Sequence, residues 1–136
     1  MLTGGCLCGA VRYRISAAPL MTRLCWCRVC QYIGGGGATV NSLFPAEAFA
    51  VEGVLGDYAC VADSGNHMHR RFCVQCGTPV FSQSEERRHV VIVRVGTLDN
   101  PQAVTPAMNI WIASAPSWAC IDSRLPATPA QPPPLG

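Results

Sequence analysis

Three cysteines lie within six residues in the run C-W-C-R-V-C, at Cys25, Cys27 and Cys30. This spacing lets three sulfur atoms converge from one strand-to-turn passage, and thiolate sulfur is a preferred ligand of zinc. A structural zinc site has four protein ligands, whereas a catalytic zinc site has three and keeps one position for water or substrate. The run contains no fourth ligand, so the pattern indicates an open zinc site, a site closed by a distant residue, or a disulfide cluster with one free thiol.

Cys60, Cys120, His67 and His69 are the distant residues that could close this site. A lone cysteine is more typical of a small core residue than of a ligand. The two histidines are more typical of exposed positions on a strand, and the same holds for His89. The sequence alone leaves these alternatives open.

Two further cysteine pairs share a design, C-L-C-G and C-V-Q-C-G. Cys6 and Cys8 are two residues apart on an extended segment, so both sulfur atoms face the same side. Cys73 and Cys76 have the spacing of a zinc-knuckle turn. A glycine follows each pair, where the chain most easily adopts a left-handed conformation. Together the pairs predict a closed set of four thiolates; the alternative is two disulfides or four buried thiols.

The composition limits the classes of partner. A chain of 136 residues with 49% hydrophobic residues predicts one domain with a real core. A net charge of +2 and only 13% charged residues argue against nucleic acid and anionic membranes as partners. All ten basic residues are arginine, which excludes lysine-dependent phosphate loops and Schiff-base catalysis. The arginine fork suits carboxylates.

The N-terminus has no basic start and no long apolar run, and the apolar stretch at residues 90–93 is too short to span a bilayer. We therefore expect a cytoplasmic protein. In a reducing compartment, nine cysteines are more typical of metal ligands than of disulfides.

The hydrophobic pattern predicts mostly strands. Val11, Tyr13 and Ile15 alternate with arginines, which is typical of a half-buried strand. Further strands are predicted at residues 20–25, 38–44, 57–62, 69–72, 80–82, 89–95 and 108–112. Only short helical turns fit, one after Cys30 and one near Pro45–Phe49. The predicted fold class is mainly β, a small single domain of short antiparallel sheets stapled by zinc.

Residues 126–136, P-A-T-P-A-Q-P-P-P-L-G, contain five of the eleven prolines. This composition predicts an extended tail outside the core. The zinc domain is accordingly expected to comprise residues 1–125.

Four sequence blocks occur in order along the chain. They are G-G-C-L-C-G-A-V-R-Y at residues 4–13, C-W-C-R-V-C at 25–30, R-F-C-V-Q-C-G-T-P-V-F at 71–81 and V-G-T-L-D at 95–99. These blocks resemble the glutathione-dependent formaldehyde-activating enzyme family, whose domain is shared with centromere protein V. With N-I-W at 109–111 and S-W at 117–118, the resemblance extends over about residues 3–125.

The resemblance implies a small β fold of the β-tent type with two zinc ions per chain. It implies that a structural zinc is held by Cys6, Cys8, Cys73 and Cys76, and a second, more labile zinc by Cys25, Cys27 and Cys30. It also implies a carbon–sulfur lyase whose partners are a thiol such as glutathione and a small aldehyde such as formaldehyde.

Two positions depart from the family pattern. Family members often carry histidine between the first two cysteines of the triplet, where this chain has Trp26. They also often have the sequence H-I-W near the C-terminus, where this chain has N-I-W and the histidine is replaced by Asn109. Both differences remove an imidazole near the expected site. They bear on any acid–base role and on the identity of the substrate, whereas metal binding is unaffected.

An open tris-thiolate zinc can take a substrate thiol as its fourth ligand and lower the pKa of that thiol. The resulting complex carries a net negative charge, so nearby cations must compensate. Arg23 and Arg28 flank the triplet and are the candidates, unless they are simply solvated. Trp26 either covers the metal or belongs to the core.

Three function classes follow. The first is a zinc-dependent carbon–sulfur lyase, and the second is a non-catalytic zinc- or glutathione-binding module. The third, a nucleic-acid-binding zinc domain, is disfavoured by the weak charge and the absence of lysine.

Overall fold

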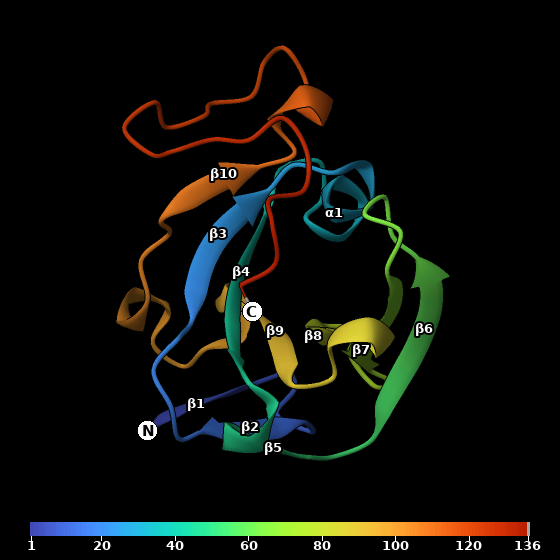
Figure 1. Cartoon of the computed structure of the whole chain (residues 1–136). Coiled ribbons are helices and arrows are strands. Elements are labelled where there is room, and N and C mark those ends of the chain that lie inside the picture. The colour runs from blue at the N-terminus through green and yellow to red at the C-terminus, as the bar shows by residue number, and fades with distance from the viewer. Residues whose placement is uncertain (136) are drawn as a thin grey trace.

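Ten β-strands in two sheets and one short α-helix make up the structure, a computed structural model that describes residues 1–135 (Figure 1). The smaller sheet has three strands in the order β1-β2-β5, and the larger has seven in the order β10-β3-β4-β9-β8-β7-β6. The elements are β1 (Leu2–Gly5), β2 (Arg12–Ile15), β3 (Met21–Cys25), α1 (Arg28–Ile33), β4 (Thr39–Pro45), β5 (Phe49–Glu52), β6 (Leu55–Val61), β7 (His67–Cys73), β8 (Pro79–Ser84), β9 (Val90–Arg94) and β10 (Met108–Ile110). The prediction of a small, mainly β, single-domain fold is confirmed.

The three-stranded sheet buries one face against the larger sheet. In β2, Tyr13 and Ile15 are buried while the alternating arginines are exposed, as the period of two predicts. The Tyr13 ring packs on Phe49, and Phe49 packs edge-on against Phe81 of the larger sheet, with ring centroids 4.8 Å apart in the second pair. This aromatic stack connects the two sheets.

Strands β1 and β5 were not predicted from the sequence. Strand β1 reads L-T-G-G and has no apolar alternation. Gly4 is required there, because a Cβ at this position would lie 2.3 Å from the Tyr13 hydroxyl and 2.3 Å from the Thr97 carbonyl oxygen. The strand therefore arises from close backbone pairing with β2, which no local pattern reveals.

The larger sheet is antiparallel except at one edge, where β10 pairs with β3 in parallel. In Figure 1 the strands of the larger sheet form one curved layer, and α1 lies near the end of β3 and the start of β4. The helix begins at Arg28 and contains Cys30, whereas the sequence predicted a helical turn only after Cys30. No helix among residues 1–135 is long and apolar enough to cross a membrane.

The proline-rich segment is mostly exposed, yet it runs along the domain. Backbone hydrogen bonds from Asn109 N–H to Pro126 O (2.9 Å) and from Thr128 N–H to Asn109 O (3.0 Å) pair it with β10. Beyond this pairing, residues 131–135 line the main cavity. The predicted tail is thus extended but is attached to the site, and its last residue, Gly136, lies outside the described residues.

Candidate metal centres

Two turns bring four cysteines together at the edge of the main core. Cys6 and Cys8 follow β1, whereas Cys73 ends β7 and Cys76 lies in the turn before β8. The four sulfur atoms lie within 4.8 Å of one another. Two of the separations are 3.6 Å, between Cys6 and Cys8, and 3.8 Å, between Cys8 and Cys73. Tetrahedral zinc with zinc–sulfur bonds of about 2.3 Å places its ligands about 3.8 Å apart, so the four cysteines fit such an ion.

The local backbone turns amides toward these sulfur atoms. The N–H groups of Gln75 and Cys76 donate to Cys73 Sγ at 3.3 and 3.4 Å, and the Val11 N–H donates to Cys6 Sγ at 3.2 Å. Such donors stabilise thiolate charge. Each turn ends in a glycine with positive φ, 83° at Gly9 and 77° at Gly77, as the sequence predicted.

Thr78 supports the same cluster. Hydrogen bonds from its hydroxyl and then from its backbone N–H lower the pKa of Cys76 to about 5. The Thr78 hydroxyl oxygen also accepts a bond from Leu7 N–H at 3.2 Å, which ties the two turns to each other. The sequence analysis did not single out Thr78, although it stands two residues after Cys76.

The second cluster consists of Cys25, Cys27 and Cys30, which are 6%, 8% and 5% exposed. Cys25 ends β3, Cys27 caps the N-terminus of α1, and Cys30 lies in its first turn. Cys27 Sγ accepts a hydrogen bond from Cys30 N–H at 3.3 Å, a cap that also orients the sulfur. The three sulfur atoms lie within 4.8 Å of one another, which fits three ligands of one tetrahedral ion.

The surroundings shift the pKa values of Cys30 and Cys25 in opposite directions. Hydrogen bonds from Cys25 and Cys27, followed by one from the Thr39 hydroxyl and by the charge of Arg94, lower the pKa of Cys30. The pKa of Cys25 is raised by its sulfur contacts with Cys27 and Cys30 and by burial. Ionisation is therefore a property of the three thiols together and not of one residue.

Neither lone cysteine joins the triplet in the part of the chain that the structure describes. Cys60 lies on β6 and accepts a hydrogen bond from Arg70 Nε at 3.4 Å. Cys120 is exposed, and all nine cysteines are free thiols.

The histidines also lie elsewhere. His67 contacts Glu86, and His69 bridges Asp57 and Glu85, with nitrogen–oxygen distances of 2.7 and 2.8 Å in the bridge. These pairs occupy an exposed patch at the β6–β7 edge of the sheet. Among residues 1–135, no histidine, cysteine or carboxylate completes the triplet as a fourth metal ligand.

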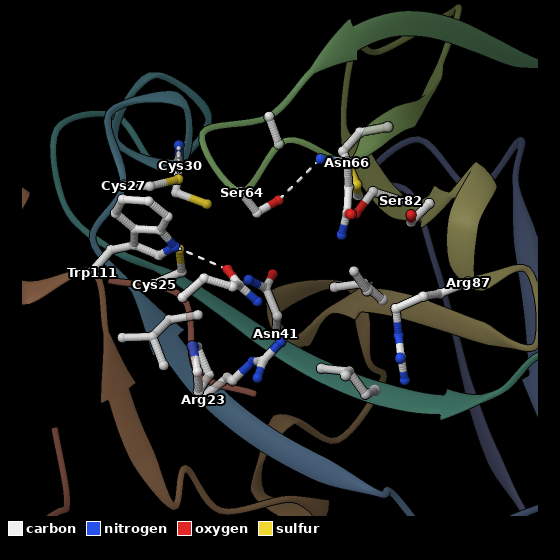
Figure 2. Close-up of a pocket in the computed structure, with 18 of the residues that line it drawn as sticks. Arg23, Cys25, Cys27, Cys30, Asn41, Ser64, Asn66, Ser82, Arg87 and Trp111 are labelled. Carbon is white, nitrogen blue, oxygen red and sulfur yellow. Dashed lines mark hydrogen bonds between the residues drawn. The ribbon is translucent and has the colours of Figure 1, made fainter. Parts of the chain in front are cut away.

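The triplet opens into a cavity of about 340 Å³. Figure 2 shows the three cysteines grouped at one end of this cavity beside Trp111, with Asn41 near the middle and Arg87 toward the other end. The cavity is lined by four arginines and one carboxylate, Asp63, so its wall is cationic; the arginines are Arg23, Arg70, Arg87 and Arg94.

Of the two arginines predicted to compensate the cluster, only Arg23 lines the cavity. Arg28 is exposed on α1, where it donates to Gln31 Oε1 at 2.6 Å and stacks over the Tyr32 ring. Arg28 thus follows the alternative of a solvated arginine, because the first turn of the helix directs its side chain away from the cavity. Arg70 and Arg94 were missed, since only sheet pairing brings β7 and β9 near the triplet.

The two positions that differ from the family pattern contact each other. Trp26 Nε1 donates to Asn109 Oδ1 at 3.3 Å, and the two residues are 6% and 1% exposed. Neither lines the cavity. Trp26 therefore belongs to the core, and the side chain that lies beside the cysteines is Trp111, whose indole N–H donates to Gln131 Oε1 at 3.0 Å (Figure 2).

A small β domain with a four-cysteine cluster between two turns and a three-cysteine cluster at a cavity defines a cysteine-rich protein suited to bind metal. The family model described as glutathione-dependent formaldehyde-activating enzyme matches residues 1–114. The chain therefore belongs to this family, and the resemblance found in the sequence is confirmed.

Two relatives agree with this assignment. A Halomonas elongata protein whose name places it in the same family is 28% identical over 130 residues, which cover 91% of this chain and 83% of the relative. A crystal structure of a Rhodobacter sphaeroides protein matches with a TM-score of 0.60 at 20% identity, covering 93% of this chain and 99% of that one. At that identity the similarity supports a shared fold.

Proposed function

We propose that this protein is a zinc-dependent carbon–sulfur lyase that joins a thiol such as glutathione to a small aldehyde such as formaldehyde. The observation that carries the proposal is the buried triplet of Cys25, Cys27 and Cys30, which has three ligands and opens into a cationic cavity. Three ligands plus one open position is the arrangement of a catalytic zinc site. The family's description and the name of the Halomonas elongata relative agree with this chemistry.

The four-cysteine cluster has a structural role in this proposal. Its ligands would be Cys6, Cys8, Cys73 and Cys76, which together would complete a closed tetrahedron around one ion. The cluster joins the β1–β2 turn to the β7–β8 turn, and it thereby holds the smaller sheet against the larger one.

At the triplet, a bound zinc ion would lower the pKa of an incoming thiol and keep it as the thiolate. The protein groups hold the three sulfur atoms in place for this. Gln31 Nε2 donates to Trp26 O at 2.8 Å and to Ser114 O at 2.9 Å, which fixes α1 relative to the end of β3. The buried hydrogen bond between Trp26 and Asn109 fixes the same segment from the other side.

The cavity wall supplies recognition of the thiol compound. Glutathione carries carboxylates at both ends, and the arginine fork binds carboxylates through paired hydrogen bonds. Arg23 and Arg87 line the cavity from β3 and from the segment before β9 (Figure 2). The cavity volume of about 340 Å³ lies in the range of pockets for small molecules, about 300–1,000 Å³.

In the reaction, a carbon–sulfur bond forms between the thiolate and the aldehyde carbon. The electron pair of the carbonyl double bond moves to oxygen, which then takes a proton from water. The product with formaldehyde is the S-hydroxymethyl adduct, and the lyase is named for the reverse direction. Leu43, Val90 and Ile92 form an apolar part of the cavity wall.

Cys30→Ser tests the proposal. The variant should lose one zinc ion per chain by elemental analysis, and its adduct formation should fall to the rate of glutathione and formaldehyde alone. Cys60→Ser, which removes a thiol outside both clusters, is the matched control and should keep both zinc and rate. An unchanged rate in Cys30→Ser, measured with the metal content, would contradict the proposed site.

The second candidate is a non-catalytic zinc- or glutathione-binding module. It is favoured by the position of His67 and His69, which pair with carboxylates at the β6–β7 edge, away from the cavity. Adduct formation must therefore proceed without an imidazole at the site. If the zinc-loaded protein binds glutathione but does not exceed the rate of free glutathione, the module is the correct assignment.

A further inference from the structure

Arg94, the last residue of β9, is a buried arginine. Its side chain is 8% exposed, and it lines the cavity together with all three cysteines of the triplet. Arginine stays protonated in proteins, so this position holds a buried positive charge.

The protein partners of Arg94 do not neutralise that charge. Its Nη1 donates to Asn41 Oδ1 at 2.6 Å, and Asn41 in turn donates to Thr39 Oγ1 at 3.0 Å. The two residues are paired across β4 and β9, so the sheet register sets this contact. Asn41 is neutral, and among residues 1–135 no carboxylate contacts Arg94. The buried Nε has no hydrogen-bond partner in the same part of the chain.

An uncompensated buried charge costs several kcal/mol. Burial lowers the pKa of Arg94, and the positive charge of nearby Arg70 acts in the same direction. The charges that act in the opposite direction are those of Cys30, Cys25 and Cys27. Since Arg94 lines one cavity with Cys25, Cys27 and Cys30 and contacts no carboxylate among residues 1–135, the cysteine cluster is the group placed to offset its charge.

We propose that Arg94 is a positioning residue whose buried charge offsets the negative charge of the metal–thiolate complex at Cys25, Cys27 and Cys30. The inference rests on the proposed function for the existence of that complex. A divalent ion with three thiolates is already anionic, and a substrate thiolate adds a further negative charge. Arg94 thus stabilises the loaded site and the thiol-bound site, and it destabilises the protein without metal.

Substitution of Arg94 should therefore weaken metal binding at the triplet without lowering the stability of the protein whose triplet is empty. With zinc in the four-cysteine cluster and none in the triplet, Arg94→Met should melt at the same temperature as the parent in the same state or higher, because a buried unpaired charge has been removed. The zinc affinity of the triplet should fall by about 10–100-fold, the range seen when groups that support metal ligands are removed. Chelator competition measures the affinity, and thermal melting with and without metal measures the stability.

Two variants serve as controls. Arg94→Lys keeps the charge and should keep zinc affinity closer to the parent than Arg94→Met does. Arg28→Met removes a charge that is next to Cys27 in the sequence but is exposed and lies outside the cavity, where solvent screens it. Its effect on zinc affinity should stay below about fivefold.

The outcomes separate this inference from the proposed function. If the parent binds the second metal and Arg94→Met binds it equally well, the role of Arg94 is refuted while the proposed function stands. The role is also refuted if Arg94→Met with an empty triplet and a filled four-cysteine cluster unfolds while the parent in the same state stays folded. If the parent and variants differ as expected but the parent forms no adduct, the charge inference stands and the lyase proposal fails. A parent that binds no second metal refutes both.

Discussion

Substitution of Cys76 should show how much the four-cysteine cluster contributes to the stability of the fold. The substitution Cys76→Ser deletes one of four sulfur atoms that lie within 4.8 Å of one another. The cluster links residues far apart in the chain, since Cys8 and Cys73 are 65 positions apart and their sulfur atoms are 3.8 Å apart. Loss of the closed metal site therefore releases a long loop.

The magnitude follows from that loop. By the chain-entropy relation for a covalent cross-link, closing a loop of 65 residues stabilises a protein by about 4 kcal/mol. A domain of this size has a total stability of about 5–15 kcal/mol, so the change removes a large part of it. The melting temperature should fall by more than about 10 °C, and the variant will be largely unfolded if the parent is at the low end of that range.

Circular dichroism against temperature, with zinc content per chain on the same sample, measures this effect. Cys30→Ser is the matched comparison, because its cluster joins residues within one short segment and closes no long loop. It should lose metal and keep a melting temperature within a few degrees of the parent. If Cys76→Ser melts at the same temperature as the parent, the four-cysteine cluster is not structural. If Cys30→Ser is destabilised as strongly as Cys76→Ser, the triplet is structural as well.

Three further predictions concern the cavity, the histidine patch and the proline-rich segment. With cobalt in the triplet, glutathione should change the sulfur-to-metal absorption at a lower concentration than mercaptoethanol does, because the arginine-lined wall binds carboxylates; equal titrations would contradict a glutathione pocket. Hydrogen bonds that the His69 ring donates to the carboxylates of Glu85 and Asp57 raise the pKa of His69 above 6.5. Their stabilisation is therefore complete below about pH 6.5 and is lost as the pH rises through the raised pKa. The melting temperature should decline over that interval, and His69→Gln should flatten the decline. Truncation after Gln131 should shift the melting temperature by less than about 2 °C, because the removed residues are mostly exposed. It should reduce the preference for glutathione over mercaptoethanol, because residues 132–135 line the cavity. An unchanged preference would show that these residues do not contact the ligand.

Much of both cysteine clusters could be predicted from local spacing. The pairs C-L-C-G and C-V-Q-C-G place sulfur atoms on one side of a turn, and their glycines take the left-handed conformation that the tight turn requires. The triplet likewise forms within one strand end and one helix turn. In each case, the atoms that converge are joined by a few backbone bonds, so the sequence restricts their geometry directly.

The strands were predicted where apolar alternation is strong, as in β2, and missed where it is absent, as in β1. Strand β1 exists because Gly4 lets the backbone approach Tyr13, and that contact is visible only once the two strands are paired. The proline-rich composition of residues 126–136 predicted an extended segment. Its course along β10 and beside the cavity depends on backbone hydrogen bonds to Asn109, which composition does not specify.

The residue types and spacings thus determined by themselves that this chain has two cysteine clusters whose geometry fits a metal ion, because cysteines a few positions apart can reach one ion in few ways. Only the tertiary structure decided which charges surround the second cluster. Arg28, adjacent in sequence, is directed to solvent by its helix, whereas Arg94, distant in sequence, is buried beside the triplet by the pairing of β4 with β9. Long-range packing of the core selects the sheet register, and the register determines which distant side chains share a cavity. A buried charge then acts strongly on neighbours that are close in space, whatever their separation in the sequence.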